Sequence, residues 1–205
     1  DIDLSWWGQH QDKVTIKNYK RWHYTNRVTG WESQQICKLL GASEAESTWS
    51  MVLDAKTWFV EYLNLNLMFT NNKPNVGLGG ISPHFIPSQQ FVEQYYNVKM
   101  PMVLGPAGVP FMFHTETIYN MIQEFEDFPE FFQTNVRFPN LITEFHLYSG
   151  YVLKQYGNYN TLYNKTHYYN VYNICHSEVG NFNNILAKAQ HDPNILTASI
   201  HRRAY

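Results

Sequence analysis

An acidic residue, Asp54, directly follows the apolar run 51–53 within the stretch MVLDAKTWFV. A hydrophobic strand that ends on a carboxylate can hold that group at the edge of a sheet, where α/β proteins bind their ligands. Lys56 lies two residues later, and strand alternation would place it on the same side as Asp54. This pattern alone favours a ligand-holding role for Asp54 only slightly over a plain strand end.

Two later segments carry further charged side chains at the ends of predicted elements. Glu144 lies in the first turn of a predicted helix, where a carboxylate is also favoured by helix electrostatics alone. The apolar segment 195–200 predicts a strand that ends at His201 and leads into Arg202, a basic cluster suited to an anion. The histidines show neither HxxxH nor HExxH spacing, so no dedicated zinc site is expected.

The composition describes a folded chain without a strong charge. Its 205 residues fit a single domain, 44% of them are hydrophobic and only 16% are charged. The net charge of -2 gives no general basic field, so nucleic acid is not an expected partner. Aromatic residues reach 17%; they suit either the apolar faces of bound sugars or a core filled with tyrosine.

The sequence also indicates a compartment. It contains no run of 18 apolar residues and no basic-then-apolar leader, so no membrane span is expected. Cys37 and Cys175 lie far apart without a CxxC pattern. We interpret them as reduced thiols of a cytoplasmic protein.

The first predicted elements form a strand, helix and strand. Residues 13–17 alternate like a half-buried strand, residues 31–40 have helical periodicity, and Gly41 is the expected helix end. The strand at 51–54 follows, and such a unit predicts a parallel pair between the first and second strands.

Later segments predict mainly helices. Thr143 is the expected N-cap and Gly157 the expected end of the helix that begins at Glu144. Residues 71–90 contain many turn-forming residues and predict a long loop. Pro87 opens another predicted helix, and Thr115 is the expected N-cap of a helix over 116–126. A further helix is predicted over 182–189, and the last strand over 195–200.

The order of five segments carries a resemblance. GWESQQICKLL, MVLDAKTWFV, PFMFHTETIYNMI, TEFHLYSGYVL and SIHRRAY follow one another in the chain. In this order they resemble bacterial and viral glycosyltransferase-like proteins with the GT-A, nucleotide-sugar-binding fold, many of them known only as domains of unknown function. The resemblance covers residues 30–205. It implies one α/β domain over 1–205, with a Rossmann-like mixed sheet flanked by helices.

The resemblance also implies roles for single residues. Glu144 corresponds to the general base. Asp54 corresponds to the donor-side acid of the D-x-D pattern, which would hold either the ribose of the donor or, with His201, Mg²⁺ or Mn²⁺. Lys56 stands where the pattern has its second acid. Two alternatives follow: Asp54 and His201 still bind a metal, or Lys56 neutralises the donor diphosphate without one. Further donor-binding residues are implied at Gln35, Lys38, His201 and Arg202. For Gln34 and Gln35, contact with the nucleotide and packing of the helix are the two alternatives.

The function that the resemblance implies is transfer of a sugar from a nucleotide-sugar donor to a glycan acceptor, in the synthesis of a surface polysaccharide. The alternatives are a non-catalytic carbohydrate- or nucleotide-binding module of the same fold, and a structural protein. At most 12 residues precede the strand at Lys13, so the first strand and helix of a GT-A fold are expected to be missing. This leaves a trimmed chain, a minimal family member or an inactive remnant.

Overall fold

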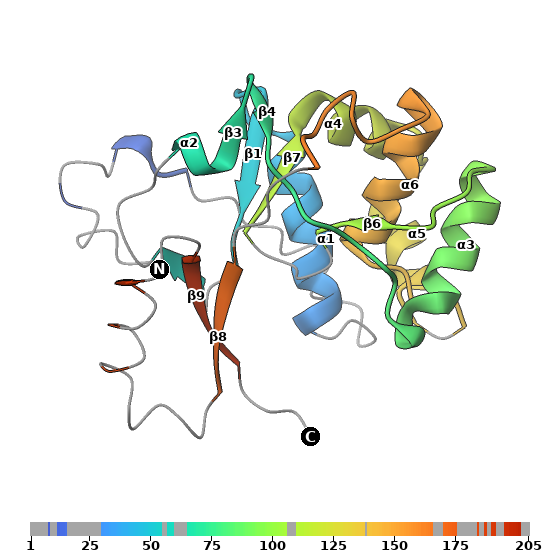
Figure 1. The fold of residues 1–205 in the computed structure, drawn as a ribbon. Helices are drawn as coiled ribbons and strands as arrows, with labels where there is room; N and C mark the ends of the chain where they lie inside the picture. The colour runs from blue at the N-terminus through green and yellow to red at the C-terminus, as the bar shows by residue number, and fades with distance from the viewer. Residues whose placement is uncertain are drawn as a thin grey trace.

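A computed structural model of the protein describes residues 8, 12–15, 30–54, 57–59, 65–105, 110–137, 139–165, 170–175, 184, 187, 190–191 and 195–201 (Figure 1). The chain has a mixed α/β fold. Its elements are, in order, α1 (Gly30–Ser43), β1 (Trp49–Val52), β2 (Thr57–Phe59), α2 (Leu65–Met68), β3 (Phe69–Thr70), β4 (Lys73–Pro74), β5 (Leu78–Gly79), the 3₁₀ helix η3 (Pro83–Phe85), α3 (Ile86–Tyr96), β6 (Val103–Leu104), β7 (Phe111–His114), α4 (Thr115–Gln123), α5 (Phe128–Asn135), α6 (Glu144–Tyr156), β8 (Asn170–Cys175) and β9 (Ile195–His201).

The described strands form four small sheets. β1 pairs with β7, β3 with β4 and β5 with β6, all antiparallel, while β9 lies between β2 and β8. β9 runs parallel to β8 and antiparallel to β2. Figure 1 shows α1 and α3–α6 gathered on one side and the β2, β9 and β8 sheet on the other.

The expected parallel partner of β1 is not seen where the structure describes it. Lys13 lies in a 3₁₀ turn, and residues 14–15 belong to no regular element. Residues 16–17 lie outside the described part of the chain. The partner that the structure does give β1 is the antiparallel β7, with Trp49 opposite His114 and Val52 opposite Phe111.

Helix α1 confirms the helical periodicity of residues 31–40 and is longer than expected. The prediction that it ends at Gly41 is wrong, because the helix continues to Ser43. Ile36 and Leu39 have no exposed surface, since this face of α1 packs against β1, α4 and α6. Three of the predicted site residues lie on or next to this helix, so its packing decides their positions.

The core between the helices and β7 is largely aromatic. Phe111, Phe113 and Tyr148 are buried, and the Phe113 ring stacks on that of Phe145 with centroids 6.0 Å apart. The Tyr148 and Tyr163 hydroxyls lie 2.6 Å apart, and the Tyr163 hydroxyl also donates to the Met112 carbonyl. Part of the high tyrosine content therefore fills the core, with its hydroxyl groups hydrogen-bonded.

Helix α6 has the predicted ends. The Thr143 side chain accepts the backbone N–H of His146 at 3.2 Å, and Gly157 ends the helix with a φ of 70°. In the middle, Gly150 lets α6 approach α3 closely, because a Cβ there would lie 2.1 Å from Cγ1 of the buried Val92. The tight contact fixes the helix that carries Glu144.

An ion pair between a buried carboxylate and a half-exposed guanidinium ties the start of α1 to the segment that follows α5. The Arg137 guanidinium donates to both carboxylate oxygens of Glu32, at 2.7 and 3.0 Å. Glu32 is 5% exposed, and the two-bond geometry restricts the relative movement of the groups. The first turn of α1 is thereby held close to the segment between α5 and α6.

The remaining predicted elements are seen in part. The strand at 195–200 is confirmed as β9, which extends to His201. Within the predicted helix 182–189, positions 184 and 187 are described and are helical. The predicted loop at 71–90 contains β4 and β5, and α3 begins at its end, where Pro87 was expected to open a helix. Over the described residues, no helix has both the length and the apolar character needed to cross a membrane.

Candidate functional site

Asp54 lies two residues beyond the end of β1, where α1 passes next to the strand. Its Oδ1 accepts a hydrogen bond from Gln34 Nε2 at 2.6 Å and lies 2.7 Å from Lys38 Nζ. Gln34 and Lys38 are one helical turn apart on α1, so they present their side chains to the same carboxylate. The Asp54 side chain keeps 18% of its surface exposed, which makes it the most accessible of the three charged groups gathered here.

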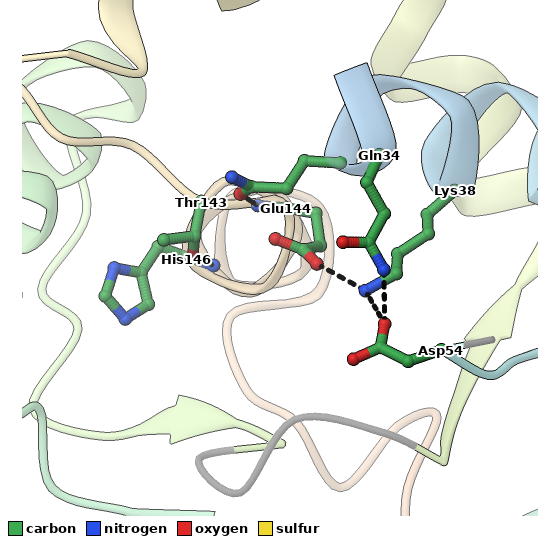
Figure 2. Close-up of polar contacts among 7 residues, drawn as sticks. Gln34, Lys38, Asp54, Thr143, Glu144 and His146 are labelled. Carbon is green, nitrogen blue, oxygen red and sulfur yellow. Dashed lines mark hydrogen bonds and ion pairs between the residues drawn. The ribbon is translucent and has the colours of Figure 1, made fainter. Parts of the chain in front are cut away.

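Lys38 joins two carboxylates that come from distant parts of the sequence. Its ammonium lies 2.7 Å from Asp54 Oδ1 and 3.2 Å from Glu144 Oε1. Figure 2 shows the Lys38 nitrogen between the two acid groups. The same nitrogen lies 5.9 Å from the centroid of the Phe145 ring, a distance at which a cation is attracted to the ring face. One cation thus connects α1, the end of β1 and the first turn of α6.

Glu144 is the first residue of α6 and is only 4% exposed. Burial raises the pKa of its carboxyl group, and the Lys38 ammonium counteracts part of this effect. The nearby Asp54 charge adds a smaller upward contribution. A carboxylate with a raised pKa is a stronger proton acceptor, as a general base for a hydroxyl group requires.

The backbone of Glu144 is held by Gln35. The first N–H groups of a helix have no partner within the helix, and Gln35 Oε1 accepts that of Glu144 at 3.1 Å. Gln35 is 1% exposed, and among the described residues its Nε2 has no hydrogen-bond partner. Its visible contact is therefore with the start of α6, and its role in donor binding stays a prediction.

We refer to Gln34, Gln35, Lys38, Asp54 and Glu144 as the Lys38 cluster. Four of its members were singled out from the sequence as site residues, and the structure brings these four together. Gln34 is the fifth member, and its spacing of four residues from Lys38 on a predicted helix is a usable signal that the two side chains share a face. His146 also follows the Thr143 cap, but Figure 2 shows its ring pointing away from the cluster.

Of the basic residues predicted for the site, Lys38 lies in the cluster, whereas the side chains of Lys56, His201 and Arg202 are not described. Lys56 and Arg202 lie outside the described residues, and for His201 the structure describes only the backbone, at the end of β9. β1 ends at Val52, so Asp54 lies beyond the strand and strand alternation does not apply to it, while the position of Lys56 relative to Asp54 stays a prediction. The Asp54 carbonyl instead accepts the backbone N–H of Thr57 at 2.9 Å, a bond typical of a turn.

Within the described part of the chain, no group of three His, Cys, Asp or Glu side chains could hold a metal ion. At Asp54, the oxygen Oδ1 already contacts an amide nitrogen and an ammonium, and a divalent cation there would be repelled by that ammonium. The side chain of His201, the second predicted ligand, is not described.

An open hollow of about 660 Å³ runs along α1 and β1 and reaches the cluster at Gln34 and Lys38. This volume lies in the range of small-molecule sites. The wall on the α1 side includes Cys37 and Gly41, and a Cβ built on Gly41 would have no atom within 4 Å. Gln34 and Lys38, which hold Asp54, line the hollow together with the hydroxyl side chains of Ser47 and Ser50, so the hollow lies on the Asp54 side of the cluster.

Comparison with known proteins adds no relative to these observations. No protein-family model matches the chain, and neither a curated protein nor a solved structure matches it.

Proposed function

We propose that the chain is a glycosyltransferase that moves a sugar from a nucleotide-sugar donor to a glycan acceptor. The observation that carries this proposal is the Lys38 cluster, in which Asp54 and Glu144, 90 positions apart in the numbering, contact the same ammonium. The order of the five sequence segments supports the same conclusion. The segment order also supports a GT-A-type arrangement and a role in polysaccharide synthesis, and the spacing of Cys37 and Cys175 supports a cytoplasmic location.

Glu144 acts as the general base in this proposal. As the acceptor oxygen bonds to the anomeric carbon of the donor sugar, its proton passes to a Glu144 oxygen. The bond between that carbon and the diphosphate breaks, and its electron pair leaves with the nucleoside diphosphate. A single displacement of this kind inverts the configuration at the anomeric carbon. The raised pKa of Glu144 supports its role, because burial favours the protonated product of the transfer.

Asp54 acts on the donor side. A carboxylate of partial exposure accepts hydrogen bonds from sugar or ribose hydroxyls. Gln34 and Lys38 hold its Oδ1, so the carboxylate is oriented before the ligand arrives and little side-chain entropy is lost on binding. The open hollow beside Gln34 and Lys38 supplies space for the rest of the donor.

A second candidate function is a non-catalytic binding module of the same fold. The observation that favours it is the contact between Lys38 and both carboxylates. An ammonium that pairs with Glu144 stabilises the ionised form and weakens the drive to accept a proton. Such a protein would bind a nucleotide-sugar and release it unchanged.

Turnover of the donor separates the two functions. The wild-type protein and Glu144→Gln are incubated with UDP-, GDP-, CMP- and TDP-sugars, with and without glycan acceptors, and nucleotide release is measured. We expect release by the wild-type protein and a loss of at least about 100-fold in Glu144→Gln, the usual contribution of a general base. Donor affinity should stay within about threefold.

Glu124→Gln is the matched control, because Glu124 pairs with the exposed Lys154 far from the cluster in the sequence. It should release nucleotide like the wild-type protein. Donor binding without release by the wild-type protein would establish the binding module instead. An equal loss of binding and release in a folded Glu144→Gln protein would remove Glu144 from the role of base.

A further inference from the structure

The position between Asp54 and Glu144 is one that a cation must occupy. Two carboxylate oxygens, Asp54 Oδ1 and Glu144 Oε1, lie within 3.2 Å of one nitrogen atom. Both side chains are largely buried, with exposed fractions of 18% and 6%, so water screens their repulsion only weakly. Bringing two such acids together without a positive charge between them would be strongly unfavourable.

We propose that the Lys38 ammonium is the built-in cation of this site, so that the nucleotide-sugar donor binds without a divalent metal ion. The inference rests on the proposed function and concerns the same site. In this arrangement the lysine stands where a metal bridging two acids would stand.

Three contacts support this assignment of Lys38. The ammonium is only 12% exposed and contacts both acids. The face of the Phe145 ring lies 5.9 Å from it and adds a third attractive contact. Gln34 Nε2 contacts the same Asp54 oxygen at 2.6 Å, which leaves that oxygen surrounded by hydrogen-bond donors and little room for a metal ion.

Lys38 and Lys56 would supply the positive charge in different ways. Lys56, two residues after Asp54, stands where the resemblance has the second acid of a metal-binding pattern. Lys38 comes from a helix 16 positions earlier than Asp54 in the numbering and holds its place through two ion pairs. Metal independence therefore does not require Lys56 to face the site.

The proposal makes a direct prediction for a truncated side chain. Lys38→Ala removes the ammonium together with the volume that it fills, and leaves the two acid oxygens facing one empty position. Hard divalent cations bind carboxylate oxygens, so the variant should gain a Mn²⁺ site that the wild-type protein lacks. Lys38→Arg keeps a positive charge in place and should not gain that site.

The experiment measures binding of Mn²⁺ alone to the full chain by electron paramagnetic resonance, and binding of UDP-, GDP-, CMP- and TDP-sugars by titration calorimetry in EDTA and in Mn²⁺. We expect Mn²⁺ to bind Lys38→Ala at least tenfold more tightly than the wild-type protein, and the gain to disappear in Lys38→Ala combined with Asp54→Asn. Lys154→Ala, which removes an exposed lysine, should behave like the wild-type protein. Donor affinity of the wild-type protein should change less than twofold between EDTA and Mn²⁺.

Each outcome has a distinct meaning. A wild-type protein that binds a donor at least tenfold more tightly in Mn²⁺, or that binds Mn²⁺ through Asp54, overturns the inference and leaves the proposed function standing. Absence of donor binding in both buffers contradicts the proposed function itself. The wild-type measurements decide the inference even where Lys38→Ala fails to fold, and thermal melts of each variant identify that case.

Discussion

The side chain of Gln35 caps the backbone of Glu144: Gln35 Oε1 accepts the Glu144 N–H at 3.1 Å. The two residues lie 109 positions apart and belong to different helices. Gln35 thereby fixes where α6 begins relative to α1, while Lys38 on the same helix contacts the Glu144 carboxylate. The backbone and the side chain of Glu144 are thus both positioned from α1.

The cap should contribute measurably to stability. Gln35→Met keeps the approximate shape of the side chain but removes the acceptor, which leaves a buried N–H without its partner. We expect the free energy of unfolding to fall by about 1–3 kcal/mol, measured by urea denaturation. Gln34→Met changes the neighbouring, half-buried side chain and serves as the control. It should lower the free energy of unfolding by less than Gln35→Met does. Equal effects of the two substitutions would argue against the capping role.

Glu144 should destabilise the fold at neutral pH. Its pKa in the folded protein is raised, mainly by burial, so stability is highest where the carboxyl is protonated and falls as the pH rises through the folded pKa. Glu144→Gln removes this titration. We expect the variant to unfold at a higher temperature than the wild-type protein at pH 7, and the difference to shrink as the pH is lowered. A difference that stays constant with pH would contradict this.

His146 should make the fold sensitive to acid. Burial lowers the pKa of His146 to about 4, and its Nδ1 lies 2.7 Å from the hydroxyl of the fully buried Ser88. The unfolded chain binds a proton near pH 6.5, so stability is lost as the pH falls from that value toward 4. Between pH 7 and pH 5 the loss should be about 2 kcal/mol.

Urea denaturation of the wild-type protein and His146→Asn at both pH values tests this expectation. The asparagine side chain can still reach toward Ser88 but does not titrate. The stability difference between the two proteins should therefore change by about 2 kcal/mol over this range. An unchanged difference would show that His146 titrates normally in the folded protein.

Two helical glycines should respond oppositely to alanine. At Gly150 the new Cβ would lie 2.1 Å from Val92 Cγ1, and Val92 is fully buried and cannot move away freely. Gly150→Ala should lower the free energy of unfolding by about 1–3 kcal/mol. At Gly41 the new Cβ meets no atom within 4 Å, so Gly41→Ala should stabilise α1 by about 0.5 kcal/mol. Thermal melts compare the pair, and equal shifts would contradict the close packing of α3 and α6.

Local sequence signals predicted the elements that local chemistry determines. The Thr143 cap, the end at Gly157 and the periodicity of 31–40 each depend on residues within a turn or two of each other. The prediction that α1 ends at Gly41 was wrong, because glycine permits a helix end but does not require one. The parallel partner expected for β1 depended on pairing over a long range, and the described partner is the antiparallel β7.

The Lys38 cluster was predicted only in part. The sequence order identified Asp54 and Glu144, but it did not show that one lysine would contact both acids. That contact depends on how α1 packs against α6, which involves the Glu32 and Arg137 pair and the buried face of α1. Spacing along one helix cannot reveal a contact between residues 106 positions apart.

We propose above that Asp54 and its neighbours bind a nucleotide-sugar. Titration calorimetry of the full chain with UDP-, GDP-, CMP- and TDP-sugars, repeated with Asp54→Ala, tests it most directly. We expect at least one donor to bind the wild-type protein, and Asp54→Ala to weaken this binding at least tenfold while the fold is retained. A folded wild-type protein that binds none of the donors, with or without Mn²⁺, would contradict it.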